Sequence, residues 1–308
     1  METQAIYRDI AKRCGGDVYI GVVGPVRTGK STFIKRFMET LVIPNITSEF
    51  ARERATDELP QSAAGRTIMT TEPKFIPEEA VKISLDDSAT LNVRMIDCVG
   101  YIVPSSLGYI ENEQPRMVVT PWFDKEIPFN LAAEIGTQKV INEHSTIGLV
   151  VTTDGSISDI PREEYEEAEQ RVVNELRQIN KPFVVLLNCT NPSAPAAVSL
   201  RASLEERYGV PVVAVNCLDL GEADIRVILS DVLFQFPVRE VAVSLPGWVT
   251  SLAPDHWLRT SLYDSIRQSA QDVERIGQLK SKITTLSECE YVSRVLVDNI
   301  DLGSGGAS

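Results

Sequence analysis

Short apolar runs alternate with helical periodicity through residues 1–237. Continuous apolar runs predict buried strands, whereas apolar positions that recur at spacings of three and four predict amphipathic helices. Strands that alternate with helices are typical of a parallel sheet with crossover helices on both faces. The expected strands are residues 18–23, 91–96, 146–151, 183–187 and 210–215, and the expected helices are 31–40, 165–179, 198–208 and 222–234. This part is therefore predicted to be an α/β domain.

The alternation stops near Pro237, where a second and smaller unit is expected to begin. Residues 241–245 alternate as in a half-buried strand, and a polar-rich helical stretch runs from about residue 256 to residue 283. The last six residues, 303–308, have the composition of a flexible linker and not of a docked strand. We therefore expect an α/β domain over 1–237 and part of an α+β domain over 238–308.

The clearest motif joins the first expected strand to the first expected helix. It fits G-x-x-x-x-G-K-S/T with Gly24, Pro25, Val26, Arg27, Thr28, Gly29, Lys30 and Ser31. A chance glycine turn is the alternative, but the flanking strand and helix lie where a phosphate-binding loop needs them. In such a loop the backbone N–H groups surround the phosphates, Lys30 reaches the β and γ phosphates, and the Ser31 hydroxyl can hold Mg²⁺. We predict that these residues and Thr32 bind a nucleoside triphosphate.

Two further segments are candidates for the same site. Asp97 ends the strand 91–96 and begins D-x-x-G with Gly100, so we expect it to contact Mg²⁺ directly or through water. The Gly100 N–H is expected to meet the γ-phosphate, although an acid after a strand can also be a helix cap. Thr70 and Thr71 are candidates for a hydroxyl that senses Mg²⁺ and the γ-phosphate, with Thr70 also a candidate metal ligand. Their alternative role is that of ordinary strand residues.

Two departures from the switch-GTPase pattern change the expected chemistry. Tyr101 follows D-x-x-G where such GTPases place a water-orienting glutamine, which predicts slow hydrolysis. The guanine-reading motif N-K-x-D is replaced by Asn188-Cys189-Thr190-Asn191, which keeps the first Asn and lacks both Lys and Asp. Adenine is therefore plausible, with Asn188 kept as a nucleotide-site candidate. We expect a P-loop NTPase of the GTPase-like, TRAFAC type that uses ATP and Mg²⁺.

Charge and composition exclude other classes of function. The chain has 43 acidic against 30 basic residues, a formal net charge of −13, so its field repels nucleic acids and anionic membranes. No apolar run approaches the ~20 residues of a membrane span, and the first residues lack the features of a signal peptide. The five cysteines are widely spaced without a C-x-x-C pair, which favours reduced structural thiols in the cytoplasm.

Several segments together carry a specific family resemblance. They are residues 21–39, 57–75, 94–101, 121–129, 132–141 and 143–155, with 245–252 and 256–259 in the second unit. Over nearly its whole length the chain resembles the stage IV sporulation protein A family, the spore-coat morphogenetic ATPases of endospore-forming bacteria. The resemblance implies that Lys30 is the Walker A lysine, Thr70 and Thr71 the sensor threonines, and Asp97 the Walker B aspartate of a catalytic site.

The same resemblance implies a cellular role. Family members hydrolyse ATP and polymerise into a basement layer on the outer forespore surface, in the mother-cell cytoplasm. A small amphipathic membrane-associated peptide holds them there, and they recruit other coat morphogenetic proteins. They also continue past Leu302, so this chain is expected to be truncated within the middle domain, without the region needed for polymer formation and membrane targeting. A GTP-dependent switch is the first alternative, followed by a scaffold that holds nucleotide without hydrolysing it; a small-molecule kinase is disfavoured.

Overall fold

The computed structural model describes residues 3–60, 72–85, 89–111, 113–271, 273–284, 286 and 289–308. The chain divides into two compact units, Met1–Val232 and Leu233–Ser308.

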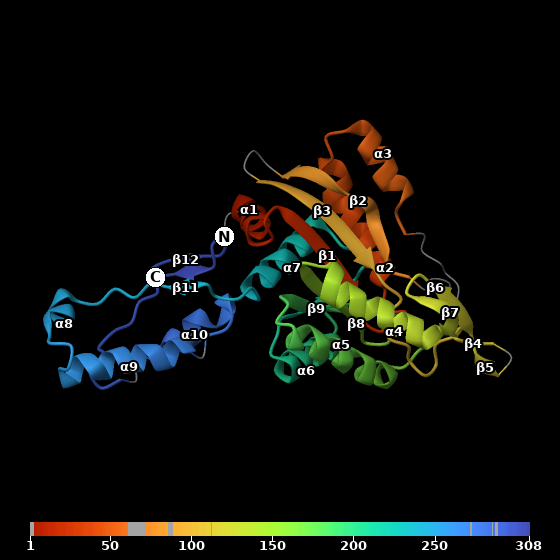
Figure 1. The fold of residues 1–308 in the computed structure, drawn as a ribbon. Helices are drawn as coiled ribbons and strands as arrows, with labels where there is room; N and C mark the ends of the chain where they lie inside the picture. Colours follow the sequence, from red (N-terminus) through yellow and green to blue (C-terminus); the bar gives the residue numbers. More distant parts are fainter. Residues whose placement is uncertain are drawn as a thin grey trace. The chain divides into compact units, whose positions relative to one another are not determined.

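A six-stranded sheet in the order β10-β9-β8-β1-β3-β2 forms the centre of the first unit (Figure 1). Its strands are β1 (Asp17–Val23), β2 (Lys74–Leu85), β3 (Ala89–Asp97), β8 (Ile147–Thr153), β9 (Phe183–Asn188) and β10 (Val212–Val215). Neighbouring strands from β10 to β3 pair in parallel, whereas β2 runs antiparallel to β3. The predicted parallel sheet is thus confirmed in its main part and wrong at the β2 edge.

Helices lie on both faces of this sheet, with α2 on one side and α5 and α6 on the other (Figure 1). Every residue of β8 and β9 is buried, as expected for parallel strands that are covered on both faces. The helices of this unit are α1 (Thr3–Arg13), α2 (Lys30–Phe37), α3 (Glu49–Asp57), α4 (Phe129–Lys139), α5 (Glu166–Gln178), α6 (Pro195–Tyr208) and α7 (Glu222–Phe234). The last two residues of α7 already belong to the second unit.

Helix boundaries follow local sequence signals. Helix α6 begins at Pro195, whose missing N–H costs nothing in the first turn. It ends at Tyr208 and is capped by Gly209 in the left-handed conformation, φ 53°. Helix α2 is shorter than the predicted helix 31–40, because a π-helical turn, η1 (Met38–Val42), follows it. Further short helical turns are η2 (Ile43–Asn45), η3 (Val140–His144) and η4 (Arg162–Tyr165).

Two small hairpins extend from the first unit near α4. They are β4 (Ile110–Glu111) with β5 (Gln114–Pro115), and β6 (Met117–Thr120) with β7 (Phe123–Pro128). The inner side of the second hairpin packs on α4 through Val118 and Ile127, which are buried together with Phe129 of that helix. The sequence pattern did not predict these hairpins or helices α1, α3 and α4.

The second unit contains a small three-stranded sheet in the order β11-β13-β12. Its elements are β11 (Glu240–Val241), α8 (Gly247–Ser251), α9 (Trp257–Gln271), η5 (Ile276–Gln278), α10 (Leu279–Thr284), β12 (Ile300–Asp301) and β13 (Gly306–Ala307). The linker prediction for 303–308 is wrong, because β13 pairs with both other strands. Strand pairing uses backbone N–H and C=O groups, which a glycine-rich segment also has.

Two other expectations for the second unit are corrected in detail. The ladder at the predicted strand 241–245 covers only Glu240–Val241. The predicted helix over 256–283 is interrupted after α9, and a new helical start follows at Arg275. The Gln278 side chain accepts from the backbone N–H groups of Glu274 and Arg275, which satisfies the donors that a helix start leaves unpaired.

Candidate functional site

The glycine-rich loop, residues 24–29, lies between the carboxyl end of β1 and the start of α2. Gly24 has φ 139°, and a Cβ there would lie 2.3 Å from the Val151 carbonyl oxygen. Gly29 has φ 91°, and a Cβ there would lie 2.3 Å from Asn188 Nδ2. Both positions therefore exclude side chains, and the loop passes directly over the ends of β8 and β9.

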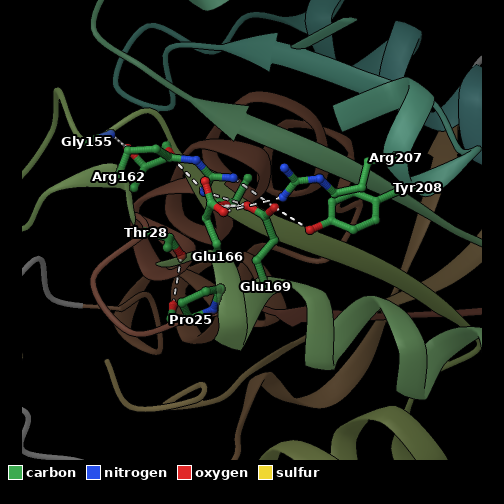
Figure 2. Close-up of polar contacts among 10 residues, drawn as sticks. Pro25, Thr28, Gly155, Arg162, Glu166, Glu169, Arg207 and Tyr208 are labelled. Carbon is green, nitrogen blue, oxygen red and sulfur yellow. Dashed lines mark hydrogen bonds and ion pairs between the residues drawn. The ribbon is translucent and has the colours of Figure 1, made fainter. Parts of the chain in front are cut away.

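Lys30 is buried and folds back onto the glycine-rich loop. Its Nζ donates to the Pro25 carbonyl oxygen at 2.6 Å. The Thr28 hydroxyl donates to the same oxygen at 3.0 Å, as Figure 2 shows. Burial lowers the pKa of Lys30, which means that the site disfavours its positive charge. An anion bound in the loop would favour the ammonium form.

Ser31 and Asp97 meet beside Lys30, although 65 residues lie between them in the sequence. The Ser31 hydroxyl donates to Asp97 Oδ2 at 2.5 Å. In the described part of the chain Asp97 Oδ1 is buried and accepts no hydrogen bond, and burial raises the pKa of this carboxyl group. A hydroxyl and a carboxylate with an unused oxygen are the hard ligands that Mg²⁺ prefers, so the residues present fit that ion.

The segment that follows Asp97 runs along the glycine-rich loop. The Tyr101 N–H donates to the Gly24 carbonyl at 3.2 Å, and the Val26 N–H donates to the Tyr101 carbonyl at 2.9 Å. Gly100 has φ 90°, and a Cβ there would lie 2.1 Å from Gly24 O and 2.7 Å from Lys30 Nζ. The structure therefore brings Gly100 close to Lys30, and the expected contact of its N–H with the γ-phosphate stays a prediction.

Asn188 supports the glycine-rich loop from β9. Its Nδ2 donates to the Thr28 carbonyl at 3.0 Å, and its Oδ1 accepts from the Cys217 N–H at 3.1 Å. Both ends of the amide are thus used within the protein. Asn191, three residues later, is exposed, and its Oδ1 accepts from the Ser193 N–H at 3.2 Å.

The remaining predicted site residues differ in how far the structure places them. Val26 is buried, whereas Arg27, with φ 59°, and Thr32 are partly exposed. Thr70 and Thr71 lie outside the described residues, so their sensor role stays a prediction.

A buried polar network next to the loop was not predicted from the sequence (Figure 2). Glu169 on α5 is fully buried, and Arg162 donates to both of its oxygens, at 2.7 and 2.9 Å. The Tyr208 hydroxyl donates to the same carboxylate at 2.7 Å, and Thr152 donates to it as well. One signal in the sequence could have indicated this network. Glu169 is an acidic residue on the apolar face of the predicted helix 165–179, between Tyr165 and the buried Val172.

The same network fixes the two ends of the segment that joins β8 to η4, residues 154–161, here called the β8 loop. Arg162, directly after this segment, donates to the carbonyl of Thr153, directly before it, at 3.3 Å. Within the β8 loop, the Ser156 hydroxyl accepts from the Thr190 N–H at 3.0 Å. Ile157 lies 3.8 Å from where a Cβ of Gly29 would be. The network therefore holds a loop that touches both the glycine-rich loop and the segment after β9.

Two kinds of feature are absent from the described residues. In that part of the chain no group of three or more His, Cys, Asp or Glu side chains is arranged to hold a metal ion. No helix among the described residues is long and apolar enough to cross a membrane.

Comparison with known proteins identifies the family. The model for "Stage IV sporulation protein A, ATPase domain" matches residues 1–237, and that for the middle domain matches 238–308. "Stage IV sporulation protein A" of Bacillus anthracis is 53% identical over 307 residues, which are 100% of this chain and 62% of that protein. The Bacillus subtilis (strain 168) protein of that name is 50% identical over 307 residues, again 100% of this chain and 62% of the relative.

The same name is carried by a relative in Clostridioides difficile (strain 630), which is 50% identical over 300 residues, 97% of this chain and 61% of the relative. The chain thus spans about three fifths of the length of these relatives. The chain belongs to the stage IV sporulation protein A family, with its sporulation ATPase domain over residues 1–237 and a match to its middle domain over 238–308.

Proposed function

We propose that this chain binds ATP with Mg²⁺ and slowly hydrolyses the ATP to ADP and phosphate. The observation that carries this proposal is the meeting of Lys30, Ser31 and Asp97 at one end of a glycine-rich loop, with Asp97 Oδ1 left without a partner. The strand order and the place of the loop between β1 and α2 are consistent with a GTPase-like P-loop NTPase of the TRAFAC type. The match to an ATPase domain supports the same reaction.

The roles of the residues follow from their chemistry. Lys30 would give up its bond to Pro25 O and donate to the β and γ phosphates, while loop N–H groups surround them. Ser31 and Asp97 would hold Mg²⁺, with Thr70 as a further candidate ligand. Bound Mg²⁺ supplies charge neutralisation on the phosphate oxygens. The Gly100 N–H would contact the γ-phosphate, and Thr70 and Thr71 would sense it.

Adenine is the proposed base because the segment after β9 offers guanine no carboxylate. In a guanine site an aspartate accepts two hydrogen bonds from the base, and Asn191 would have to replace it. Asn191 has one carbonyl oxygen, which also accepts from the Ser193 N–H, and its NH₂ group is a donor that would face the donors of guanine. An unpaired buried donor costs about 1–3 kcal/mol. At ~1.4 kcal/mol per tenfold change, the affinity for GTP would fall by about one to two powers of ten.

The cellular role is proposed from the family. The relatives are named stage IV sporulation protein A. We propose that this protein acts in spore-coat assembly. Its full form would polymerise into a basement layer on the outer forespore surface, in the mother-cell cytoplasm. The proposed partners are a second copy of the protein, a small amphipathic membrane-associated peptide and other coat morphogenetic proteins, with residues 1–237 as the ATPase domain and 238–308 as part of the middle domain.

ATP binding and phosphate release by the purified chain test this function. Lys30→Ala is expected to abolish ATP binding in a folded protein, because the described loop has no second cation in the same place. A Lys30→Ala variant that binds ATP within a few-fold of wild type, with an unchanged circular dichroism spectrum, would contradict the proposal. Binding without phosphate release, dependent on Lys30, would favour the scaffold that holds nucleotide.

Competition between nucleotides tests the base. With Mg²⁺ present, ATP is expected to displace a fluorescent ATP analogue at lower concentration than GTP does. GTP that displaces the analogue tenfold more effectively than ATP would overturn the adenine assignment and favour the GTP-dependent switch.

A further inference from the structure

Tyr101 occupies the position after D-x-x-G, yet its side chain is directed into the body of the protein. It is 2% exposed, and its hydroxyl donates to Glu175 Oε2 on α5 at 2.5 Å. The Arg171 guanidinium lies over its ring, 4.2 Å from the ring centre. Arg171 in turn donates to Glu134 on α4 at 2.8 Å and to Glu175 at 3.3 Å. Tyr101 is therefore held by two side chains of α5, one of which is also paired with α4.

The backbone of Tyr101 is held on its other side by the glycine-rich loop. Its N–H and carbonyl pair with Gly24 and Val26, at 3.2 and 2.9 Å. Gly100, immediately before it, has no room for a Cβ between Gly24 O and Lys30 Nζ. One residue thus connects α5, through its side chain, to the loop beside Lys30, through its backbone.

We propose that Tyr101 is a positioning residue, which fixes Gly100 and the glycine-rich loop so that the γ-phosphate end of the site is assembled before nucleotide binds. This inference rests on the proposed function. A water-orienting side chain has to point at the γ-phosphate, whereas the Tyr101 hydroxyl is committed to Glu175. The position that orients water in switch GTPases is used here as an anchor.

The hydrogen bond between Tyr101 and Glu175 also explains what holds the segment after Asp97 in place. A hydrogen bond to a charged group is stronger than a neutral one, and this bond is mostly shielded from water. Its loss would leave the ring in place under Arg171 and remove the hydrogen bond to Glu175, which is the polar part of the attachment to α5. The γ-phosphate end should then become less ordered, and hydrolysis should suffer more than ATP binding.

Tyr101→Phe is the central variant of the test, because it keeps the ring and removes only the hydroxyl. We expect it to lower kcat about tenfold while the dissociation constant for a fluorescent ATP analogue stays within about twofold. Glu175→Gln keeps an oxygen acceptor and is expected to retain most of the activity. The matched control is Glu166→Gln on the same helix, whose carboxylate is exposed and pairs with Arg207 at 3.6 Å, and it should leave kcat unchanged.

Amide hydrogen exchange of the nucleotide-free protein gives a second readout that needs no ATPase activity. The Val26 and Tyr101 amides should exchange faster in Tyr101→Phe than in wild type, while amides of β9 stay unchanged. Unchanged exchange at Val26 and Tyr101 would overturn the inference, whatever the enzyme does with ATP.

The kinetic outcomes separate this inference from the proposed function. Wild-type turnover in Tyr101→Phe, in a protein whose hydrolysis depends on Lys30, would overturn the anchor and leave the ATPase proposal standing. Faster turnover in Tyr101→Gln than in wild type would also overturn it, because the position would then orient water. A wild-type chain that does not bind ATP contradicts the proposed function, and the exchange measurement still decides the anchor.

Discussion

The buried pair of Glu169 and Arg162 gives a stability prediction that can be worked from the structure. Both Glu169 oxygens accept hydrogen bonds from Arg162, and the carboxylate has no exposed surface. Glu169→Gln keeps the shape and removes the charge, so the Arg162 guanidinium, with a 12% exposed side chain, loses its counter-charge. Removal of one partner from a buried ion pair costs about 3–5 kcal/mol, because the other charge is left unpaired.

We expect Glu169→Gln to lie near the lower end of this range, since the Gln oxygen can still accept one bond from Arg162 or Tyr208. A loss of about 3 kcal/mol lowers the midpoint of thermal unfolding by about 6–12 °C for a domain of this size. The control is Glu143→Gln, which removes one member of the exposed pair with Lys139 at 3.2 Å. That pair is worth only about 0.3–0.5 kcal/mol.

The assay must report on the first unit alone, because the two units need not unfold together. Trp248 and Trp257 are 56% and 61% exposed, so Phe can replace both and leave Trp122 as the only tryptophan. Urea unfolding followed by Trp122 fluorescence then gives the free energy of unfolding of the first unit. A difference below 1 kcal/mol between wild type and Glu169→Gln would refute the reasoning, as would an equal loss in Glu143→Gln.

Other predictions concern the proposed nucleotide site directly. Asp97→Asn should weaken Mg²⁺ retention in the nucleotide complex, which a Mg²⁺ titration of bound ATP analogue measures. The double variant Thr70→Ala, Thr71→Ala should bind ATP and hydrolyse it poorly, so wild-type phosphate release would end the sensor assignment. Gly100→Ala places a Cβ 2.1 Å from Gly24 O and should abolish hydrolysis; a variant that keeps both its melting temperature and its activity would contradict the crowding argument.

Much of the first unit follows from the sequence pattern. The expected strand at 91–96 is extended in β3 by two residues at its start and one at its end, and the strand at 210–215 is shortened in β10. The pairing of Ser31 with Asp97 was also implied, because adjacent parallel strands bring their carboxyl ends to one edge of the sheet. β1 and β3 are such neighbours, with Val22 opposite Asp97.

The missed features depend on tertiary contacts that periodicity does not record. The strand β2 contains Pro77 and an irregular register between Ile76 and Val81, so it lacks a clean alternation. The direction of the Tyr101 side chain depends on Glu175, which comes from a helix 74 residues later. A polar residue in a buried position, such as Glu169, contradicts the apolar pattern that was used to assign its helix, and its partners come from three separate elements.

The contacts around the glycine-rich loop divide into two groups with different supports. At the Gly24 end, the loop is paired with the segment that carries Tyr101 and is thereby connected to α5. At the Gly29 end, Asn188 holds the Thr28 carbonyl, and the β8 loop holds the Thr190 N–H. The first group adjoins the proposed γ-phosphate position and the second adjoins the segment proposed to read the base. Substitutions in the first group should therefore change hydrolysis more than affinity, and substitutions in the second should change affinity and base preference more than turnover.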